Sequence, residues 1–287
     1  MLAIVNMMLA ALLGIALGFN KSQPFLPVSQ LDAVIAHAHL AGLGWGTLMV
    51  MGAGYRMLPM MLPSAQPRGP WPLAATVLTQ LGAWLLVGGR LAAAGPAVLV
   101  TAAALAAAGI ATFLVQVAWM LRHRRPPPTA QPRPDPGVAH ALAALLWLAV
   151  SAAAGVWLAV APASEATLAG TMAYGVLALV GFLAQMVVGV AARLLPLYAW
   201  LWGFHDREHR DNPPSMHTAL SRPAQLFALA LWSLGVPALV FGLAGDRLGW
   251  ISAAAGALAL AVVIGGANLL LGVRRLWSLD GAPPPGP

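Results

Sequence analysis

Eight long apolar runs dominate this chain of 287 residues and constrain its fold more than any other feature. A helix needs about 20 apolar residues to cross the hydrocarbon core of a bilayer. Only 8% of the residues are charged, whereas a soluble domain carries about 25%. The sequence therefore predicts an all-α integral membrane protein with eight transmembrane helices. The predicted helices cover residues 1–19, 31–55, 71–93, 95–121, 138–161, 166–192, 219–243 and 248–273.

Polar and proline-rich segments separate these runs. Ser29 is followed three residues later by Asp32, a spacing that resembles a capping box at the start of the second helix. The repeated prolines of residues 126–136 cannot continue a helix and predict an extended cytoplasmic linker. We expect the proline-rich tail, residues 279–287, to be disordered.

The distribution of Lys and Arg predicts the orientation of the chain. Twelve of the 15 lie after the second, fourth and sixth runs or near the C-terminus, and only Lys21, Arg90 and Arg247 lie on the other side. The positive-inside rule then places both termini in the cytoplasm of a bacterial-type inner membrane, as a multi-pass protein. Because orientation accounts for the net charge of +7, we expect the lipid bilayer as partner and no nucleic acid.

An internal similarity suggests a duplication. Aligning Gly44 with Gly181 also aligns Gly52 with Gly189 and Pro59 with Pro196. This predicts two four-helix repeats, residues 1–125 and 137–278. An even number of helices in each copy makes the two repeats parallel.

Two histidines inside the second apolar run give the most specific chemical indication. Ionisable side chains within a transmembrane segment are costly and indicate function, so His37 and His39 are the candidate metal ligands. Residues two apart on a helix point about 200° away from each other. A single iron therefore cannot take both unless the start of the helix is unwound. The alternative is two interfacial histidines wetted from outside.

Four further residues are candidates for a cofactor site on the same reasoning. Gly42 and Gly46 form a small-x-x-x-small pair, which gives room either to a neighbouring helix or to a flat macrocycle. Tyr174 corresponds to His37 in the second repeat and is either a hydrogen-bond donor to the site or a core tyrosine. Met172 is either a soft ligand for haem iron or copper, or apolar filler.

The stretch from Ala36 to Trp45, continued to Pro59, resembles the small four-helix membrane proteins related to haem–copper oxidase subunit I. It resembles the NnrS-like haem and copper membrane proteins less closely. The resemblance covers this stretch of the second apolar run and extends weakly to the similar sequence in the sixth. It implies that His37 or His39 ligates a b-type haem near the outer membrane face. A true subunit I has more helices and further membrane histidines, so proton-pumping oxygen reduction is not expected here.

The resulting expectation is a membrane haem protein for electron transfer or for handling of a gas such as NO or O2. Haem b is the expected cofactor and copper the second candidate, with a redox protein or a second copy of the chain as partner. The alternative is a metal-free transporter or assembly factor that retains the fold. The absence of cysteine excludes disulfides, thiolate metal sites and covalent haem attachment through a C-x-x-C-H motif. No nucleophile elbow or phosphate-binding glycine loop indicates a particular enzymatic reaction.

Overall fold

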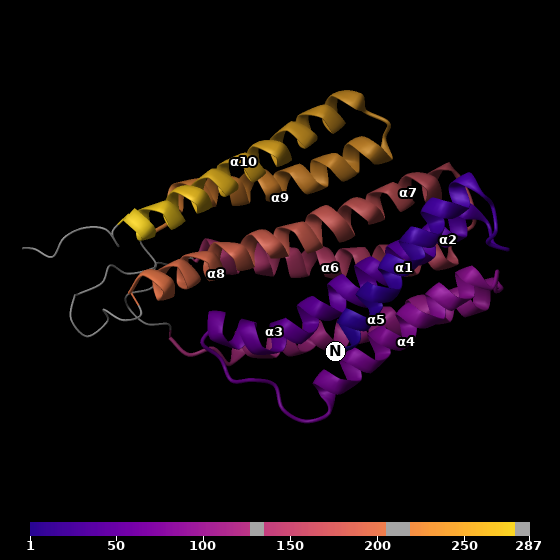
Figure 1. Cartoon of the computed structure of the whole chain (residues 1–287), viewed down its shortest axis with the longest axis horizontal. Coiled ribbons are helices and arrows are strands. Elements are labelled where there is room, and N and C mark those ends of the chain that lie inside the picture. Colours follow the sequence, from indigo (N-terminus) through magenta and orange to yellow (C-terminus); the bar gives the residue numbers. More distant parts are fainter. Residues whose placement is uncertain (127–134, 205–218, 279–287) are drawn as a thin grey trace, which may run out of the picture. The chain divides into compact units, whose positions relative to one another are not determined.

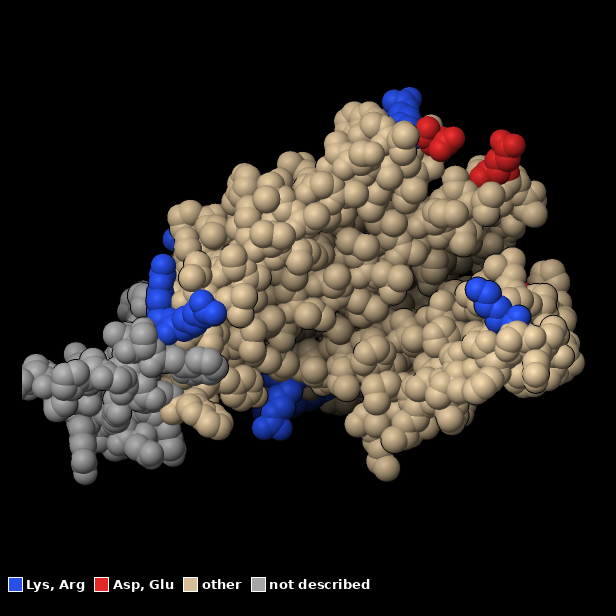
Figure 2. All heavy atoms as spheres, turned by 45° about the horizontal axis from the view of Figure 1, so that its top comes forward, with Lys and Arg blue, Asp and Glu red and all other residues tan. Residues whose placement is uncertain are grey.

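The computed structural model describes residues 1–126, 135–204 and 219–278, and the regular structure in this part is helical (Figure 1). Within these residues, eight helical spans are long and apolar enough to cross a membrane, which confirms the predicted all-α transmembrane class. The surface seen in Figure 2 carries few charged side chains, as a lipid-facing surface requires. The helices are α1 (Leu2–Ser22), α2 (Gln30–His39), η1 (Leu40–Thr47), α3 (Leu48–Met61), α4 (Trp71–Leu91), α5 (Pro96–Arg122), α6 (Pro136–Val160), α7 (Glu165–Gly175), η2 (Val176–Ala184), α8 (Gln185–Phe204), α9 (Arg222–Ala244) and α10 (Leu248–Ser278).

The described chain forms two compact units. One contains Met1–Pro127 and Trp147–Leu179, and the other contains Pro128–Leu146 and Val180–Pro287. This division does not coincide with the two predicted repeats, which remain a prediction. Most of the predicted linker, residues 127–134, and all of the predicted tail lie outside the described residues.

The second span consists of α2, η1 and α3, and the sixth consists of α7, η2 and α8. Both spans therefore contain a π-helical segment, which the sequence analysis did not predict. The alignment of Gly44 with Gly181 places η1 on positions 177–184, almost the full length of η2. The two π-helical segments therefore occupy matching positions in the two spans. Short π-helical segments occur frequently at functional sites.

The start of the second span follows the predicted capping pattern. Ser29 is the N-cap of α2, and its hydroxyl accepts a hydrogen bond of 3.0 Å from the Asp32 backbone N–H. The same hydroxyl donates to the Asp32 carboxylate at 2.6 Å. The helix therefore begins one residue earlier than predicted, at Gln30, with its first turn satisfied.

The end of the second span lies further along the chain than predicted, because the helix continues through Pro59 to Met61. Proline has no N–H, so the carbonyl of Tyr55, four residues earlier, loses its helical donor. The Gln66 side chain replaces that donor with a hydrogen bond of 3.4 Å to the Tyr55 carbonyl. The apolar run predicted an earlier end, at residue 55, and a single sequence does not show this contact from the following loop.

A buried amide connects three spans of the first unit. Asn6 of α1 is fully buried and donates to the Gly44 carbonyl of η1 at 2.5 Å and to Gln80 Oε1 of α4 at 2.8 Å. Its own oxygen accepts from Gln80 Nε2 at 3.1 Å and from Trp84 Nε1 at 2.9 Å. A polar group in hydrocarbon needs internal partners, and this network supplies them for Asn6. It fixes the register of α1 against the second span.

Glycines set the distance between α4 and α5. A Cβ atom on Gly82 would lie 2.5 Å from the Ala106 backbone nitrogen of α5, and Gly109 makes a comparably close approach to Thr79 of α4. Small residues of this kind allow two membrane helices to pack backbone to backbone. The α4–α5 pair therefore depends on the absence of side chains at these two positions.

This packing predicts that valine lowers the stability at one glycine of α4 and leaves it nearly unchanged at another. We expect Gly82→Val to lower the free energy of unfolding by about 1–3 kcal/mol, because the new side chain overlaps the α5 backbone. Gly88→Val is the matched control, since no atom lies within 4 Å of a Cβ there. Denaturant unfolding of the purified protein in detergent measures both. Equal stability of the two variants would contradict the close α4–α5 contact.

Candidate functional site

His37 of α2 packs against α1 through a backbone contact. Its Nδ1 lies 3.0 Å from the Ala10 carbonyl oxygen. A carbonyl oxygen can only accept, so Nδ1 carries a proton and donates it, and in the neutral ring Nε2 keeps its lone pair. Among the described residues no hydrogen bond reaches Nε2, and that atom is not sealed from the surface. The α1 backbone therefore fixes the His37 ring through Nδ1, and Nε2 has no described hydrogen-bond partner.

Gly14 provides the room for the His37 ring. A Cβ atom at Gly14 would lie 2.9 Å from His37 Cε1, closer than real side chains tolerate. Gly14 follows Ala10 by four residues, so the carbonyl acceptor and the gap in side chains lie one turn apart on the same face of α1. The local sequence of α1 thus determines where the imidazole can lie.

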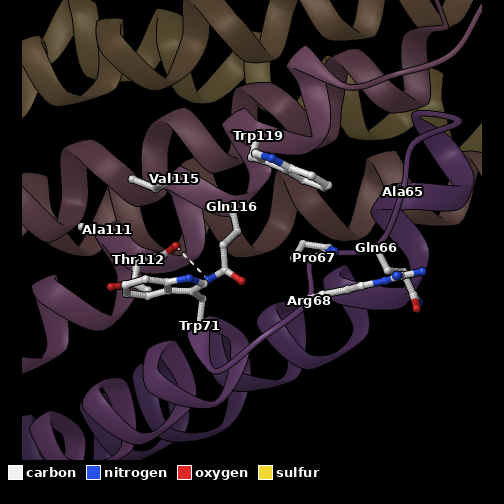
Figure 3. Close-up of a pocket in the computed structure, with 10 residues that line it drawn as sticks. All are labelled: Ala65, Gln66, Pro67, Arg68, Trp71, Ala111, Thr112, Val115, Gln116 and Trp119. Carbon is white, nitrogen blue, oxygen red and sulfur yellow. Dashed lines mark hydrogen bonds between the residues drawn. The ribbon is translucent and has the colours of Figure 1, made fainter.

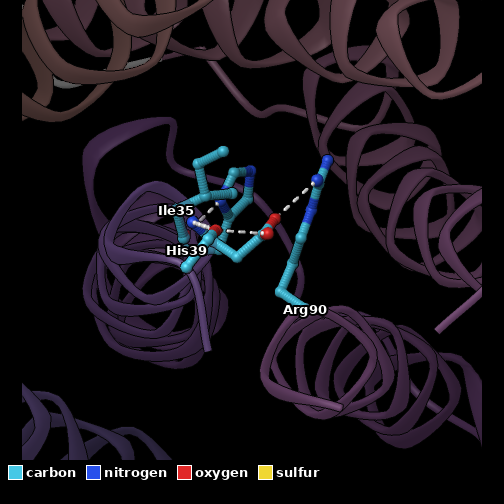
Figure 4. A network of polar contacts seen from close by, with 5 residues as sticks. Ile35, His39 and Arg90 are labelled. Atoms are coloured by element: carbon cyan, nitrogen blue, oxygen red, sulfur yellow. Dashed lines mark hydrogen bonds and ion pairs between the residues drawn. The ribbon is translucent and has the colours of Figure 1, made fainter. Parts of the chain in front are cut away.

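His39 has both ring nitrogens engaged. Its Nδ1 donates to the Ile35 carbonyl at 2.8 Å (Figure 4), one turn back in the same helix. Its Nε2 lies 3.2 Å from the Tyr174 hydroxyl of α7, which must then be the donor. The two rings are stacked with centroids 5.8 Å apart, and Tyr174 in turn lies against Gly155 of α6. This histidine is satisfied by protein groups alone.

The two histidines thus contact different helices, His37 touching α1 and His39 touching α7. Residues two apart on a helix point in nearly opposite directions, which explains this divergence. Because α2 is α-helical through His39, the helix start is not unwound in the way that would direct both rings to one metal.

An ion pair lies near His39, at the junction of α2 and α4 (Figure 4). Arg90 Nη1 is 3.1 Å from Asp32 Oδ1, and about a third of each side chain is exposed. Arg90 Nε is buried and has no hydrogen-bond partner among the described residues. The guanidinium therefore has donor capacity beyond its contact with the carboxylate.

Gly42, Gly46 and Met172 make no described contact with the His37 ring. A Cβ at Gly42 would meet no atom within 4 Å, whereas the close contact of this segment falls at Gly44, against Asn6. Gly46 is half-buried. Met172 is 58% exposed and lies on the surface of its unit. Of the predicted residues, the structure joins only His39 and Tyr174 directly.

A bare metal ion finds no ready set of ligands in the described part of the chain. No group of three or more His, Asp or Glu side chains is close enough there to hold one. A macrocyclic cofactor, which supplies four ligands itself, needs only one or two from the chain.

Sequence reasoning missed the amide-based polar contacts. In the first unit it did not select Asn6 or Gln80. In the second unit it did not select His140, which is only 2% exposed and lies 3.5 Å from fully buried Gln185. Trp232 meets the His140 ring edge to face, with centroids 6.5 Å apart. Isolated Asn, Gln and His within apolar runs were the signal that could have identified these contacts.

Comparison with protein-family models, with curated proteins and with solved structures gives no match. The case for any function therefore depends on the geometry of the chain itself.

The contrast between the two histidines predicts their reactivity toward diethylpyrocarbonate, which modifies an unprotonated ring nitrogen. In the wild-type protein we expect His37 to react and His39 to react at least several-fold more slowly, because the Tyr174 hydroxyl covers its Nε2. Tyr174→Phe should accelerate the modification of His39 and leave that of His37 unchanged. Peptide mass spectrometry over a time course measures both. A His39 rate that does not respond to Tyr174→Phe would contradict the contact.

Proposed function

We propose that the protein is an integral membrane haem-binding protein in which Nε2 of His37 would hold the haem iron. The observation that carries this proposal is the hydrogen bond from His37 Nδ1 to the Ala10 carbonyl. Metal-ligating histidines almost always donate their other ring N–H to a carbonyl or carboxylate, which fixes the ring and its tautomer. His37 has this arrangement without using Nε2 for any described contact.

The donor set favours haem over a copper ion. A haem iron would need one or two ligands from the protein. The chain offers one free nitrogen at His37, whereas the Tyr174 hydroxyl occupies that of His39. When bound, the haem would supply an iron able to change oxidation state or bind a small gas. We therefore propose electron transfer or handling of NO or O2 as the role, with a redox protein or a second copy of the chain as partner.

Visible spectroscopy of two histidine variants tests the ligand assignment. We expect protein purified from haem-supplied cells to show a Soret band, His37→Ala to lose most of it, and His39→Ala to retain it. The second variant is the matched control because it removes the same side chain two residues along the helix. Gly14→Val, which displaces the His37 ring, should reproduce the loss, and Gly18→Val, with no atom within 4 Å of its Cβ, should not.

Two results would overturn the proposal. A colourless wild-type protein that takes up no haem on reconstitution would favour a metal-free transporter or assembly factor. A Soret band that survives His37→Ala and disappears in His39→Ala would move the ligand to the second histidine and contradict the geometric argument.

We also propose that the protein lies in a bacterial-type inner membrane with both termini in the cytoplasm, on the strength of the Lys and Arg distribution. The absence of native cysteine allows single-cysteine labelling with a membrane-impermeant maleimide. Ala163→Cys, in the loop before α7, should react in intact cells with a permeable outer membrane. Ala65→Cys, in the loop before α4, should react only after lysis. The reverse pattern would contradict the orientation.

A further inference from the structure

A cavity of about 930 Å³ lies in the first unit between α5, the start of α4 and the loop that joins α3 to α4 (Figure 3). Its walls are mainly apolar, with Trp71, Val115 and Trp119 among them. Its volume is in the range of pockets that bind small organic ligands. It is separate from the His37 region, which involves α1 and α2.

Backbone contacts hold the loop wall of the cavity in place. The Arg125 N–H donates to the Pro63 carbonyl at 2.7 Å, and Ser64 forms an isolated β-bridge with Arg124. The His123 ring stacks on Trp119, with centroids 4.5 Å apart. The cavity is therefore bounded by fixed elements at this end.

The amide of Gln116 is oriented by its neighbours. Its Nε2 lies 2.9 Å from the Thr112 carbonyl and 3.0 Å from the Tyr55 hydroxyl. The carbonyl can only accept, so this end of the amide must be the NH2 group. Gln116 Oε1 then faces away from that carbonyl; it is buried and has no hydrogen-bond partner among the described residues. Figure 3 shows the amide between Trp71 and Trp119.

Two polar groups of α5 at the cavity, Gln116 and Thr112, have acceptor capacity that no described donor uses. Gln116 is 7% exposed, and its unpaired atom is a carbonyl oxygen. The Thr112 hydroxyl uses its proton on the Ala108 carbonyl, at 2.8 Å, which leaves only its lone pairs. A buried acceptor without a donor is unfavourable, so the complementary ligand is one that brings an O–H or N–H donor.

The depth of the acceptor indicates which donors can reach it. Gln116 precedes Arg122, the last residue of α5, by six residues. At about 1.5 Å per residue this places the amide roughly 9 Å inside the end of the helix. A phospholipid keeps its polar head at the interface and would offer only acyl chains at this depth. A lipid-soluble molecule with a polar aromatic head can enter further, and the two indole rings provide flat surfaces for it.

We propose that this cavity binds an amphipathic molecule with a hydroxyl-bearing aromatic head and an apolar tail, of the quinol class. The hydroxyl group donates to Gln116 Oε1, and the ring packs against Trp71 and Trp119. The proposal concerns binding alone and does not depend on haem.

A reduced and oxidised pair of probes tests the donor requirement. Decylubiquinol has hydroxyl donors, and decylubiquinone has the same ring and tail without them. In nanodiscs under anaerobic conditions, titration followed by tryptophan fluorescence should give a Kd for the quinol about 10-fold lower than for the quinone. Gln116→Leu should abolish this preference and leave quinone binding unchanged. Thr101→Val is the control, because it removes an exposed hydroxyl from α5 outside the cavity and leaves the contacts of Gln116 in place.

Ala111→Phe, at an exposed position lining the cavity, should weaken both probes and so locate the binding. Thermal unfolding establishes that each variant is folded before the titration. The proposal fails if the wild type shows no saturable quenching, if Gln116→Leu retains the preference, or if Ala111→Phe has no effect. It also fails if raising the phosphatidylglycerol content of the nanodiscs displaces the quinol competitively, which would identify a phospholipid site.

Discussion

The hydrogen bonds of the Asn6 amide fix the first unit of this protein. In a bilayer, a buried amide without internal partners is costly, and Asn6 finds its partners on η1 and α4. Ala10 and Gly14 follow at intervals of four residues, so they share one face of α1 with Asn6. The register set by Asn6 therefore also brings the Ala10 carbonyl and the Gly14 gap opposite His37.

Within membrane-spanning helices, polar atoms that lack a protein partner indicate where a ligand can bind. Asn6 and His39 are satisfied by the chain, which gives them a structural role. His37 Nε2 and Gln116 Oε1 have no partner among the described residues. His37 Nε2 has a lone pair on a ring that is hydrogen-bonded through Nδ1, which suits a metal. Gln116 Oε1 is a buried acceptor of a residue that lines a cavity, which suits a ligand with a hydroxyl donor. The two proposed functions follow from this difference in chemistry.

The sequence predicted the features that depend on length and period. Apolar length predicted the eight spans, and helical period predicted that His37 and His39 diverge. The features it missed depend on tertiary donors: Asn6 contacts the π-helical segment, and Gln66 compensates for Pro59 within α3. Gly42 was selected for close packing by its spacing alone, but the close contact falls at Gly44 because that residue faces Asn6. Such choices depend on the neighbouring helix, which a single sequence does not display.

The most direct test of the account is the protonation pattern of the His37 ring in haem-free protein. Solid-state ¹⁵N NMR of histidine-labelled protein in lipid, with His37→Gln to assign the signal, distinguishes a protonated from an unprotonated ring nitrogen. The account predicts a protonated Nδ1 and an unprotonated Nε2 for His37, with loss of the Nε2 signal at its original position when haem is added. A protonated Nε2 with an unprotonated Nδ1 would contradict the hydrogen bond to Ala10, and with it the proposed ligand.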